Sequence, residues 1–206
     1  MNATYSSAVT AAVSNPTLID QIFPAKTRTR SVALVIGFSL LVALSAQIVL
    51  PLPGTTVPIT GQTFAVLLTG VLLGSRLGAL ALIAYLVEGA LGAPFFRGGA
   101  SGFAYLIMSE TNGYLLAYPL AAYLTGYLSE RGWDRNSLTA AAAMFLGSTV
   151  ILTGGFLGLT RYTGAELAFA KGVAPFILGD IIKIALAAAL LPVGWRLLGR
   201  RRQTHT

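Results

Sequence analysis

Six long apolar segments, separated by short polar or glycine-rich stretches, dominate the pattern of hydrophobic and polar positions along this chain. A helix needs about 20 mostly apolar residues to cross a lipid bilayer, and most of the segments approach that length. They predict a six-transmembrane-helix bundle, with helices at residues 31–52, 60–74, 77–93, 113–128, 137–160 and 175–198. Only Ser75 and Arg76 separate the second segment from the third, so we expect these two helices to form an antiparallel hairpin.

The composition favours a membrane-embedded chain. Charged residues make up 10% of the sequence, against roughly 25% in an ordinary soluble domain, and apolar residues make up 55%. The mean hydropathy is +0.74. A chain of 206 residues with this composition cannot bury its apolar side chains in one water-soluble core. We therefore expect an all-α membrane protein.

The Lys and Arg residues set the expected orientation. With the N-terminus inside, ten of them fall on cytoplasmic segments and three on outer loops. Because cytoplasmic loops carry an excess of Lys and Arg, this orientation places both termini in the cytoplasm. The chain then divides into a polar N-terminal extension at residues 1–30, the six-helix domain at residues 31–198 and a basic tail at residues 199–206. Since the basic residues form no single face, the net charge of +7 does not indicate nucleic-acid binding.

The predicted outer loops are unusual in composition. The sequence GAPFFRGGASGF, at residues 92–103, is too apolar for a free surface loop and too rich in glycine for a spanning helix. Irregular backbone at membrane depth survives where protein buries it or where it lines a cavity. We therefore expect the loop at residues 94–112 to fold over or into the bundle, and the outer loops to cap a binding pocket. The sequence GAELAFAKG, at residues 164–172, predicts a short amphipathic helix.

Three ionisable side chains fall inside predicted spans: Glu88, Asp180 and Lys183. Such residues are costly in a bilayer and indicate a functional site by default. Asp180 and Lys183 are three residues apart, so they share one helix face near its outer end. They predict a substrate-binding site in the outer half of the bundle, and the alternative is an ion pair that only fixes helix packing. Glu88, near the outer end of the third helix, either contacts substrate or caps loop backbone.

Neutral residues near the same end complete the set of substrate-binding candidates. Gln62, at the start of the second helix, bonds either a ligand amide or a loop carbonyl. Tyr85 lies on the third helix, and Gly99 belongs to the glycine-rich outer loop. Phe95 and Phe96 either pack within the bundle or line a pocket for an apolar ring system.

Small residues on the first helix suggest a contact surface. Ser39 and Ala43 are four residues apart, a spacing that lets helices approach closely in lipid. They serve either packing within the bundle or docking of another membrane protein.

Several function classes are excluded. The chain has no Walker A pattern, so it does not hydrolyse ATP by that route. Its only histidine is His205, in the polar tail, and it has no cysteine and no cluster of metal ligands. The sequence therefore predicts a substrate-binding protein without a cofactor or metal, and not an enzyme.

Four short motifs, in this order, carry a resemblance to a known family: VPITGQT at residues 57–63, GAPFFRGG at 92–99, NGY at 112–114 and PFILGDIIK at 175–183. Together they resemble the BioY family, the biotin-specific substrate-binding (S) components of energy-coupling factor (ECF) transporters. The resemblance covers residues 47–189, most of the chain.

The resemblance implies high-affinity biotin capture at the plasma membrane of a prokaryote, by a six-helix bundle with an outward-facing site closed by outer loops. It also implies two kinds of partner, a transmembrane coupling subunit and ABC-type ATPases. The family's GD-x-x-K aspartate and lysine belong to the biotin site and match Asp180 and Lys183. The family's small-residue docking face on the first helix is best matched by Ser39 and Ala43, where serine replaces the usual alanine.

The chemistry of biotin fits a paired carboxylate and ammonium. The carboxylate of Asp180 accepts from the ureido N–H groups, and charge-assisted hydrogen bonds of this kind are strong. Lys183 donates either to the ureido carbonyl or to the carboxylate tail, and its place beside Asp180 favours the ureido carbonyl.

The alternative function is a stand-alone, ion-coupled secondary carrier of biotin or a related small vitamin. Such carriers have inverted repeats and a coupling-ion site, and this sequence has no clear internal repeat. An intramembrane enzyme would need a nucleophile and a base that the spans do not contain.

Overall fold

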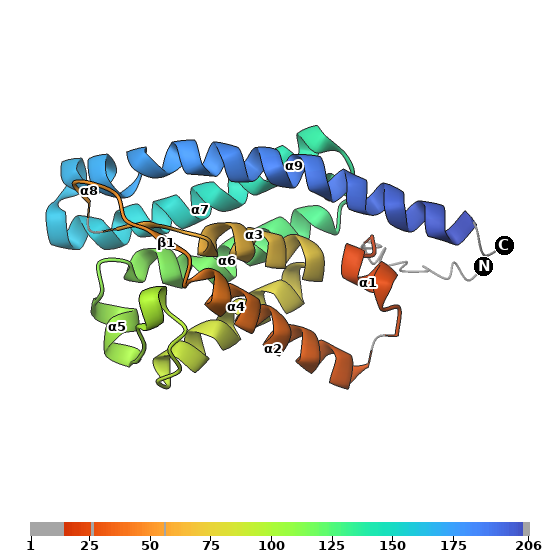
Figure 1. Ribbon diagram of the computed structural model, residues 1–206, viewed down its shortest axis with the longest axis horizontal. Coiled ribbons are helices and arrows are strands. Elements are labelled where there is room, and N and C mark those ends of the chain that lie inside the picture. Colours follow the sequence, from red (N-terminus) through yellow and green to blue (C-terminus); the bar gives the residue numbers. More distant parts are fainter. Residues whose placement is uncertain (1–14, 26, 56, 204–206) are drawn as a thin grey trace, which may run out of the picture.

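Helices account for most of this protein. The computed structural model describes residues 15–25, 27–55 and 57–203. In chain order, the elements of the described residues are α1 (Leu18–Ile22), α2 (Arg28–Ser45), β1 (Val49–Leu50), β2 (Ile59–Thr60), α3 (Gln62–Leu73), α4 (Ser75–Ala90), the 3₁₀ helix η1 (Arg97–Gly99), α5 (Phe103–Met108), α6 (Asn112–Ser129), the 3₁₀ helix η2 (Trp133–Arg135), α7 (Ser137–Thr163), α8 (Ala165–Gly172) and α9 (Ala174–Gln203). Figure 1 shows an elongated bundle, with α7 and α9 along one side and α2 and α4 on the other.

Each of the six predicted segments corresponds to one helix, namely α2, α3, α4, α6, α7 and α9, although the boundaries of several differ. The first helix ends at Ser45 and not near residue 52 as predicted. The reason is that Val49 and Leu50 pair with Thr60 and Ile59 in a short antiparallel ribbon. Strands of two residues leave no periodic pattern in a sequence, so the hydrophobic pattern missed them.

Within the residues that the structure describes, three helical segments are long and apolar enough to cross a membrane: Arg28–Ser45, Ser137–Thr163 and Ala165–Leu198. α3 is also apolar but has 12 residues. Helices of this length and composition are typical of a membrane protein. That all six helices cross the bilayer stays a prediction.

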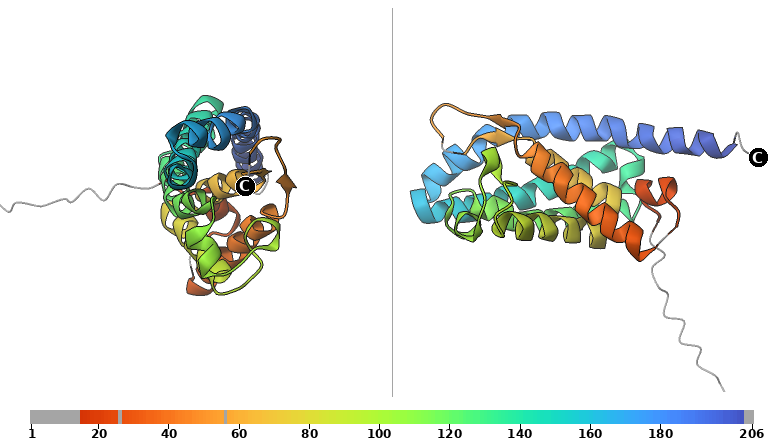
Figure 2. Two further views of the ribbon diagram at one scale, coloured as in Figure 1. Left: turned by 90° about the vertical axis from the view of Figure 1, so that its left-hand side faces the viewer. Right: turned by 60° about the horizontal axis from the view of Figure 1, so that its bottom comes forward.

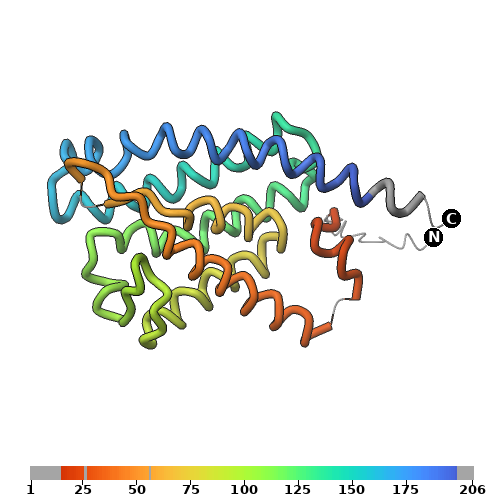
Figure 3. Tube along the Cα trace, in the orientation of Figure 1, coloured from red at the N-terminus to blue at the C-terminus, as the bar shows by residue number. Residues whose placement is uncertain are grey.

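The two ends of the bundle differ in structure. Figure 3 shows α1 and the end of α9 together at one end of the molecule, which we call the α1 end. The β1–β2 ribbon, α5 and α8 lie at the opposite end, which we call the α8 end, and the right-hand view of Figure 2 shows the same division. The described parts of both terminal regions thus lie at one end.

Local sequence determines where the helices begin and turn. The Thr27 hydroxyl accepts a hydrogen bond from the backbone N–H of Arg30 at 3.2 Å and so caps α2. The Asn136 side chain accepts from the N–H of Leu138 at 2.8 Å and caps α7. α3 and α4 meet at Gly74, whose φ of +83° is strained for residues with a side chain, and this gives the predicted hairpin.

The glycine-rich loop at residues 94–112, which we call the outer loop after its predicted side, folds back onto the bundle, as the sequence predicts. Phe96 is fully buried, and its N–H donates to the carbonyl of Ala100 at 2.9 Å. The N–H of Gly102 donates to the carbonyl of Gly89, on α4, at 2.8 Å. The predicted amphipathic segment is also helical and forms α8.

Glycines bring the central helices into close contact. α6 packs against α3, α4 and α7. A Cβ atom added at Gly158, on α7, would lie 2.8 Å from the Cα of Gly113, on α6. The two backbones are therefore as close as glycine alone permits.

A buried carboxylate holds the C-terminal half of α9 in place. Asp134, in η2, is 1% exposed and accepts a hydrogen bond from the indole N–H of Trp195 at 2.7 Å. Burial raises the pKa of this carboxyl above its ordinary value, and the Trp195 hydrogen bond opposes that rise. The guanidinium of Arg135 lies over the Trp195 ring, 4.6 Å from its centroid. α9 is thereby attached to the connection between α6 and α7.

Gly158→Ala is predicted to destabilise the bundle, because the added methyl meets the backbone of α6, which cannot turn away as a side chain can. Overpacking of this kind costs about 1–3 kcal/mol. Gly37→Ala, on α2, is the matched control, since a Cβ there would meet no atom within 4 Å. Thermal unfolding in detergent tests this: Gly158→Ala unfolds at a lower temperature than the wild type, and Gly37→Ala does not. Equal unfolding temperatures for both variants would contradict the close contact.

Candidate binding site

One pocket lies toward the α8 end, between the β1–β2 ribbon, the start of α3, and helices α6, α7 and α9. Polar and aromatic side chains make up most of its wall. The lining residues are Val57, Pro58, Thr60, Gln62, Thr63, Arg97, Tyr105, Thr111, Tyr114, Leu115, Tyr118, Leu152, Phe176, Asp180 and Lys183.

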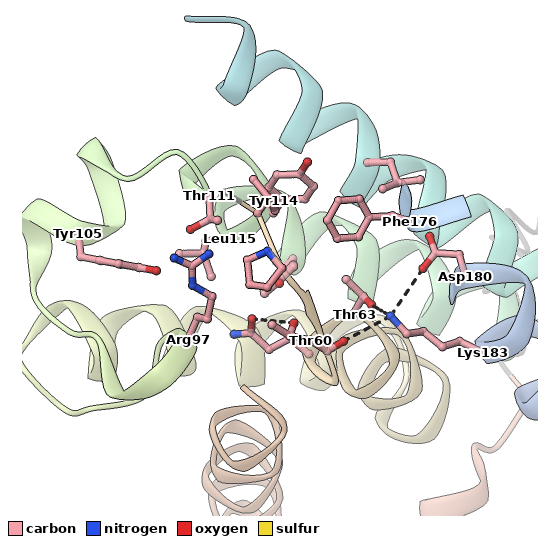
Figure 4. A pocket seen from close by; sticks show the side chains of 15 residues that line it. Thr60, Thr63, Arg97, Tyr105, Thr111, Tyr114, Leu115, Phe176, Asp180 and Lys183 are labelled. Carbon is pink, nitrogen blue, oxygen red and sulfur yellow. Dashed lines mark hydrogen bonds and ion pairs between the residues drawn. The ribbon is translucent and has the colours of Figure 1, made fainter. Parts of the chain in front are cut away.

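An ion pair on α9 forms one end of the pocket. The ammonium of Lys183 lies 3.7 Å from a carboxylate oxygen of Asp180, and the two residues are one turn apart. The other carboxylate oxygen of Asp180 accepts a hydrogen bond from the Ser148 hydroxyl, on α7. Lys183 also donates to the Thr63 hydroxyl at 2.6 Å and to the Thr60 carbonyl at 3.4 Å, which Figure 4 shows as dashed lines. The pair therefore joins α9 to α7, α3 and the ribbon.

Hydrogen bonds continue from the ion pair across the pocket. The Thr60 hydroxyl donates to the Gln62 side-chain carbonyl at 3.2 Å. The Gln62 amide N–H donates to the Tyr85 hydroxyl at 2.6 Å. Tyr85 in turn donates to the backbone carbonyl of Phe95, in the outer loop, at 3.2 Å. This chain of bonds fixes the Gln62 amide and ties the loop to the wall of the pocket.

Aromatic rings from α6 and α9 form another wall. Tyr114 and Tyr118 lie one turn apart on α6, and both are buried. The ring of Tyr114 lies 6.1 Å from that of Phe176, and its hydroxyl donates to the carbonyl of Gly172, in α8. Flat apolar surfaces beside a few fixed polar groups are typical of small-molecule sites.

Arg97 supplies a second cation. In Figure 4 its guanidinium and the ammonium of Lys183 lie at opposite ends of the pocket. Its position depends on a turn at Gly98 and Gly99, whose φ angles are +63° and +80°. A ligand with a polar group at each end and an apolar middle matches this arrangement.

Comparison with known proteins assigns the family. The model of the BioY family matches residues 15–200. A probable biotin transporter from Pyrococcus horikoshii is 39% identical over 163 residues, which are 79% of this chain and 94% of that protein. A biotin transporter from Rhizobium etli is 36% identical over 188 residues, which cover 84% of this chain and 98% of that protein.

The chain belongs to the BioY family. The resemblance in its motifs is thereby confirmed, and the family is one of transport proteins and not of enzymes.

A solved structure shares the fold. The S-component for biotin from an ECF-type ABC transporter superposes with a TM-score of 0.72, covering 82% of this chain and 93% of that chain. The two are 20% identical in sequence. The helical arrangement described above is therefore the fold of that S-component.

Three of the predicted substrate-binding residues line the pocket: Gln62, Asp180 and Lys183. Tyr85, Phe95 and Phe96 lie behind its wall. The ring of Tyr85 lies 6.5 Å from that of Phe95 and 5.7 Å from that of Phe96. These aromatic residues support the lining residues without themselves lining the pocket.

Four other predicted residues lie elsewhere than expected. Glu88 and Gly99 do not line the pocket, and Ser39 and Ala43 do not lie on the surface. Glu88 points toward α2, where its carboxylate accepts from the Ser39 hydroxyl at 2.8 Å. Ser39 is fully buried and Ala43 is 5% exposed, so in this conformation these small residues pack within the bundle and offer no docking face. Gly99 is exposed and shapes the turn beside Arg97. The polar group that satisfies Glu88 comes from another helix, which sequence spacing alone does not reveal.

Sequence reasoning missed several lining residues. Arg97 is one of the three basic residues predicted on outer loops, and in the sequence such a residue indicates only topology. Tyr114 and Tyr118 share one face of an otherwise apolar helix, and that spacing is the signal that would have found them. Thr63 lies inside the VPITGQT motif, but it is uncharged, so its residue type does not mark it as a site residue.

Tyr85→Phe is predicted to destabilise the protein, because it leaves the buried Gln62 amide and the Phe95 carbonyl without the hydroxyl that each contacts. An unsatisfied buried group costs about 1–3 kcal/mol. Tyr123→Phe is the matched control, since Tyr123 is 45% exposed and its hydroxyl bonds no other described residue. Thermal unfolding of the purified variants tests this. A lower unfolding temperature for Tyr85→Phe alone supports the hydrogen-bond chain, and equal unfolding temperatures for the two variants argue against it.

Proposed function

We propose that this chain captures biotin and is the substrate-binding component of an ECF-type uptake system. Membership of a family whose relatives are named biotin transporters carries this proposal. The pocket supports it, because its two charged ends and aromatic wall suit a ligand with a ureido head, an apolar bicyclic body and a carboxylate tail.

Each end of the ligand has a partner in this proposal. Asp180 accepts from the ureido N–H groups, and Lys183 donates to the ureido carbonyl. Arg97, at the other end of the pocket, receives the carboxylate tail. Two cations at opposite ends favour this division, since Lys183 is already close to Asp180 and far from Arg97 in Figure 4. Tyr114, Tyr118 and Phe176 pack against the bicyclic body.

The membrane arrangement is part of the proposal. Six helices within residues 31–198 cross the plasma membrane of a prokaryote, with residues 1–30 and 199–206 on the cytoplasmic side. The pocket then opens at the α8 end, toward the outside.

A transmembrane coupling subunit and ABC-type ATPases supply energy, and biotin is the ligand without any further cofactor. Since Ser39 and Ala43 are buried, the coupling subunit contacts the exposed face of α2, at Ile36, Leu40 and Leu44.

Asp180→Asn and Lys183→Met are predicted to weaken biotin binding. Each variant leaves a polar group of the ureido ring without its charged partner, which lowers affinity roughly tenfold or more. Lys171→Met is the control, since Lys171 is exposed on α8 and does not line the pocket. Isothermal titration of the purified chain with biotin is the measurement. If all three variants bind biotin with wild-type affinity, the ion pair serves only helix packing. If the wild-type chain does not bind biotin, the substrate assignment is wrong.

Biotin uptake is predicted to depend on ATP hydrolysis by the partner subunits. Proteoliposomes that contain the chain, its coupling subunit and the ATPases are expected to accumulate labelled biotin only when ATP is available to the ATPases. A matched preparation whose ATPases carry an inactivating substitution in the phosphate-binding lysine is the control. Equal accumulation in both preparations, driven by an ion gradient, would assign the chain as a secondary carrier.

A further inference from the structure

A second cleft lies at the α1 end, remote from the pocket that we assign to biotin. It is bounded by α1, the start of α2, the α3–α4 turn and the last turns of α6. Three arginines and two carboxylates line it, namely Arg30, Arg76, Arg131, Asp20 and Glu130. We call it the basic cleft.

Both carboxylates of the basic cleft are already engaged. Asp20 forms an ion pair with Arg30 at 2.9 Å, and its other oxygen accepts from the N–H of Thr17. Glu130 accepts from the backbone N–H of Ser75 at 2.8 Å and from the Ser75 hydroxyl at 2.9 Å. Glu130 therefore caps the start of α4, where the partial positive charge of the helix offsets a carboxylate.

The arginines, in contrast, keep unused charge. Within the described residues, neither Arg76 nor Arg131 has a carboxylate partner. Arg76 is exposed, and Arg131 lies over the ring of Tyr127, 3.4 Å from its centroid. The Nε of Arg30 is buried and has no hydrogen-bond partner among the described residues. The cleft thus offers an anion two guanidinium groups that form no ion pair with another described residue.

The exposed face of α6 changes in character toward the cleft. Leu116 and Leu120 are 51% and 60% exposed, and they are followed at helical spacing by Tyr123, Tyr127 and finally Arg131. Tyrosines 123 and 127 are stacked, with ring centroids 6.2 Å apart. Aliphatic, aromatic and basic side chains in that order match the hydrocarbon, interfacial and phosphate levels of a bilayer.

α4 carries a similar stripe in the opposite chain direction, which passes from aliphatic to basic side chains without an aromatic level. Its exposed side chains are Val87, Ile83 and Leu80, each about half exposed, and then Arg76 at the cleft. α4 packs against α6, so the two stripes lie on neighbouring helices and their arginines line the same cleft.

We propose that the basic cleft binds the phosphate of an anionic phospholipid, whose acyl chains lie along the exposed stripes of α4 and α6. Basic pockets beside membrane helices recognise anionic headgroups through this chemistry. An acidic peptide would match the arginines equally well but not the aliphatic stripes that lead to them. The lipid therefore accounts for both observations.

Titration of the detergent-purified chain with phosphatidylglycerol or phosphatidylcholine, read by native mass spectrometry, tests the proposal. The cleft variant is Arg76→Gln with Arg131→Gln. The matched control is Arg28→Gln with Arg196→Gln, which removes the same charge from exposed arginines that do not line the cleft. Phosphatidylglycerol binds the wild type more tightly than phosphatidylcholine. Each arginine near a headgroup contributes about 1 kcal/mol, so the cleft variant weakens phosphatidylglycerol binding roughly tenfold or more. The control keeps wild-type affinity.

A third variant, Arg76→Lys with Arg131→Lys, keeps the charge and retains most of the affinity, which separates loss of charge from loss of fold. Circular dichroism checks that every variant is helical. The proposal is overturned if both glutamine variants lose affinity equally, or if the two lipids bind alike. It is also overturned if glycerol phosphate or a polyglutamate peptide occupies the cleft as tightly as phosphatidylglycerol does.

Discussion

The largely buried ion pair between Asp180 and Lys183 is the constraint on which the rest of this structure depends. Two charges removed from water are tolerated only where further hydrogen bonds satisfy them, and removal of one partner from such a pair costs roughly 3–5 kcal/mol. Here the additional partners come from three other elements, as Ser148 on α7, Thr63 on α3 and the Thr60 carbonyl on β2. α9 is therefore positioned by its charges as well as by its apolar surface.

The remainder of the fold holds those partners in place. Glycine contacts let α6 and α7 approach closely, which brings Ser148 within reach of α9 and leaves Tyr114 and Tyr118 facing the pocket. The outer loop returns to α4 and places Arg97 opposite the ion pair. The polar groups of the pocket thus lie toward the α8 end, and the arginines of the basic cleft lie at the α1 end.

The sequence predicted the parts of this arrangement that rest on local properties. Helix positions followed from hydropathy and length, and Asp180 and Lys183 were conspicuous because charges are rare in apolar segments. Contacts between distant segments left no such signal. Glu88 was an equally conspicuous charge, but its partner is Ser39, 49 residues away, and only the structure reveals that pairing. Arg97 was treated as a marker of topology because a loop arginine has no periodicity that indicates the direction of its side chain.

The assignment of Asp180 to the ureido head of biotin is the central claim, and a binding cycle tests it most directly. Dissociation constants are measured by titration for biotin and for an analogue methylated at the ureido nitrogens, each with the wild-type chain and with Asp180→Asn. If Asp180 accepts from the ureido N–H groups, methylation weakens binding strongly in the wild type and only slightly in the variant, since the contact is already impaired there. Additive losses, with methylation equally harmful in both proteins, would mean that Asp180 does not contact the ureido group and that the charged pair lies outside the ligand contacts.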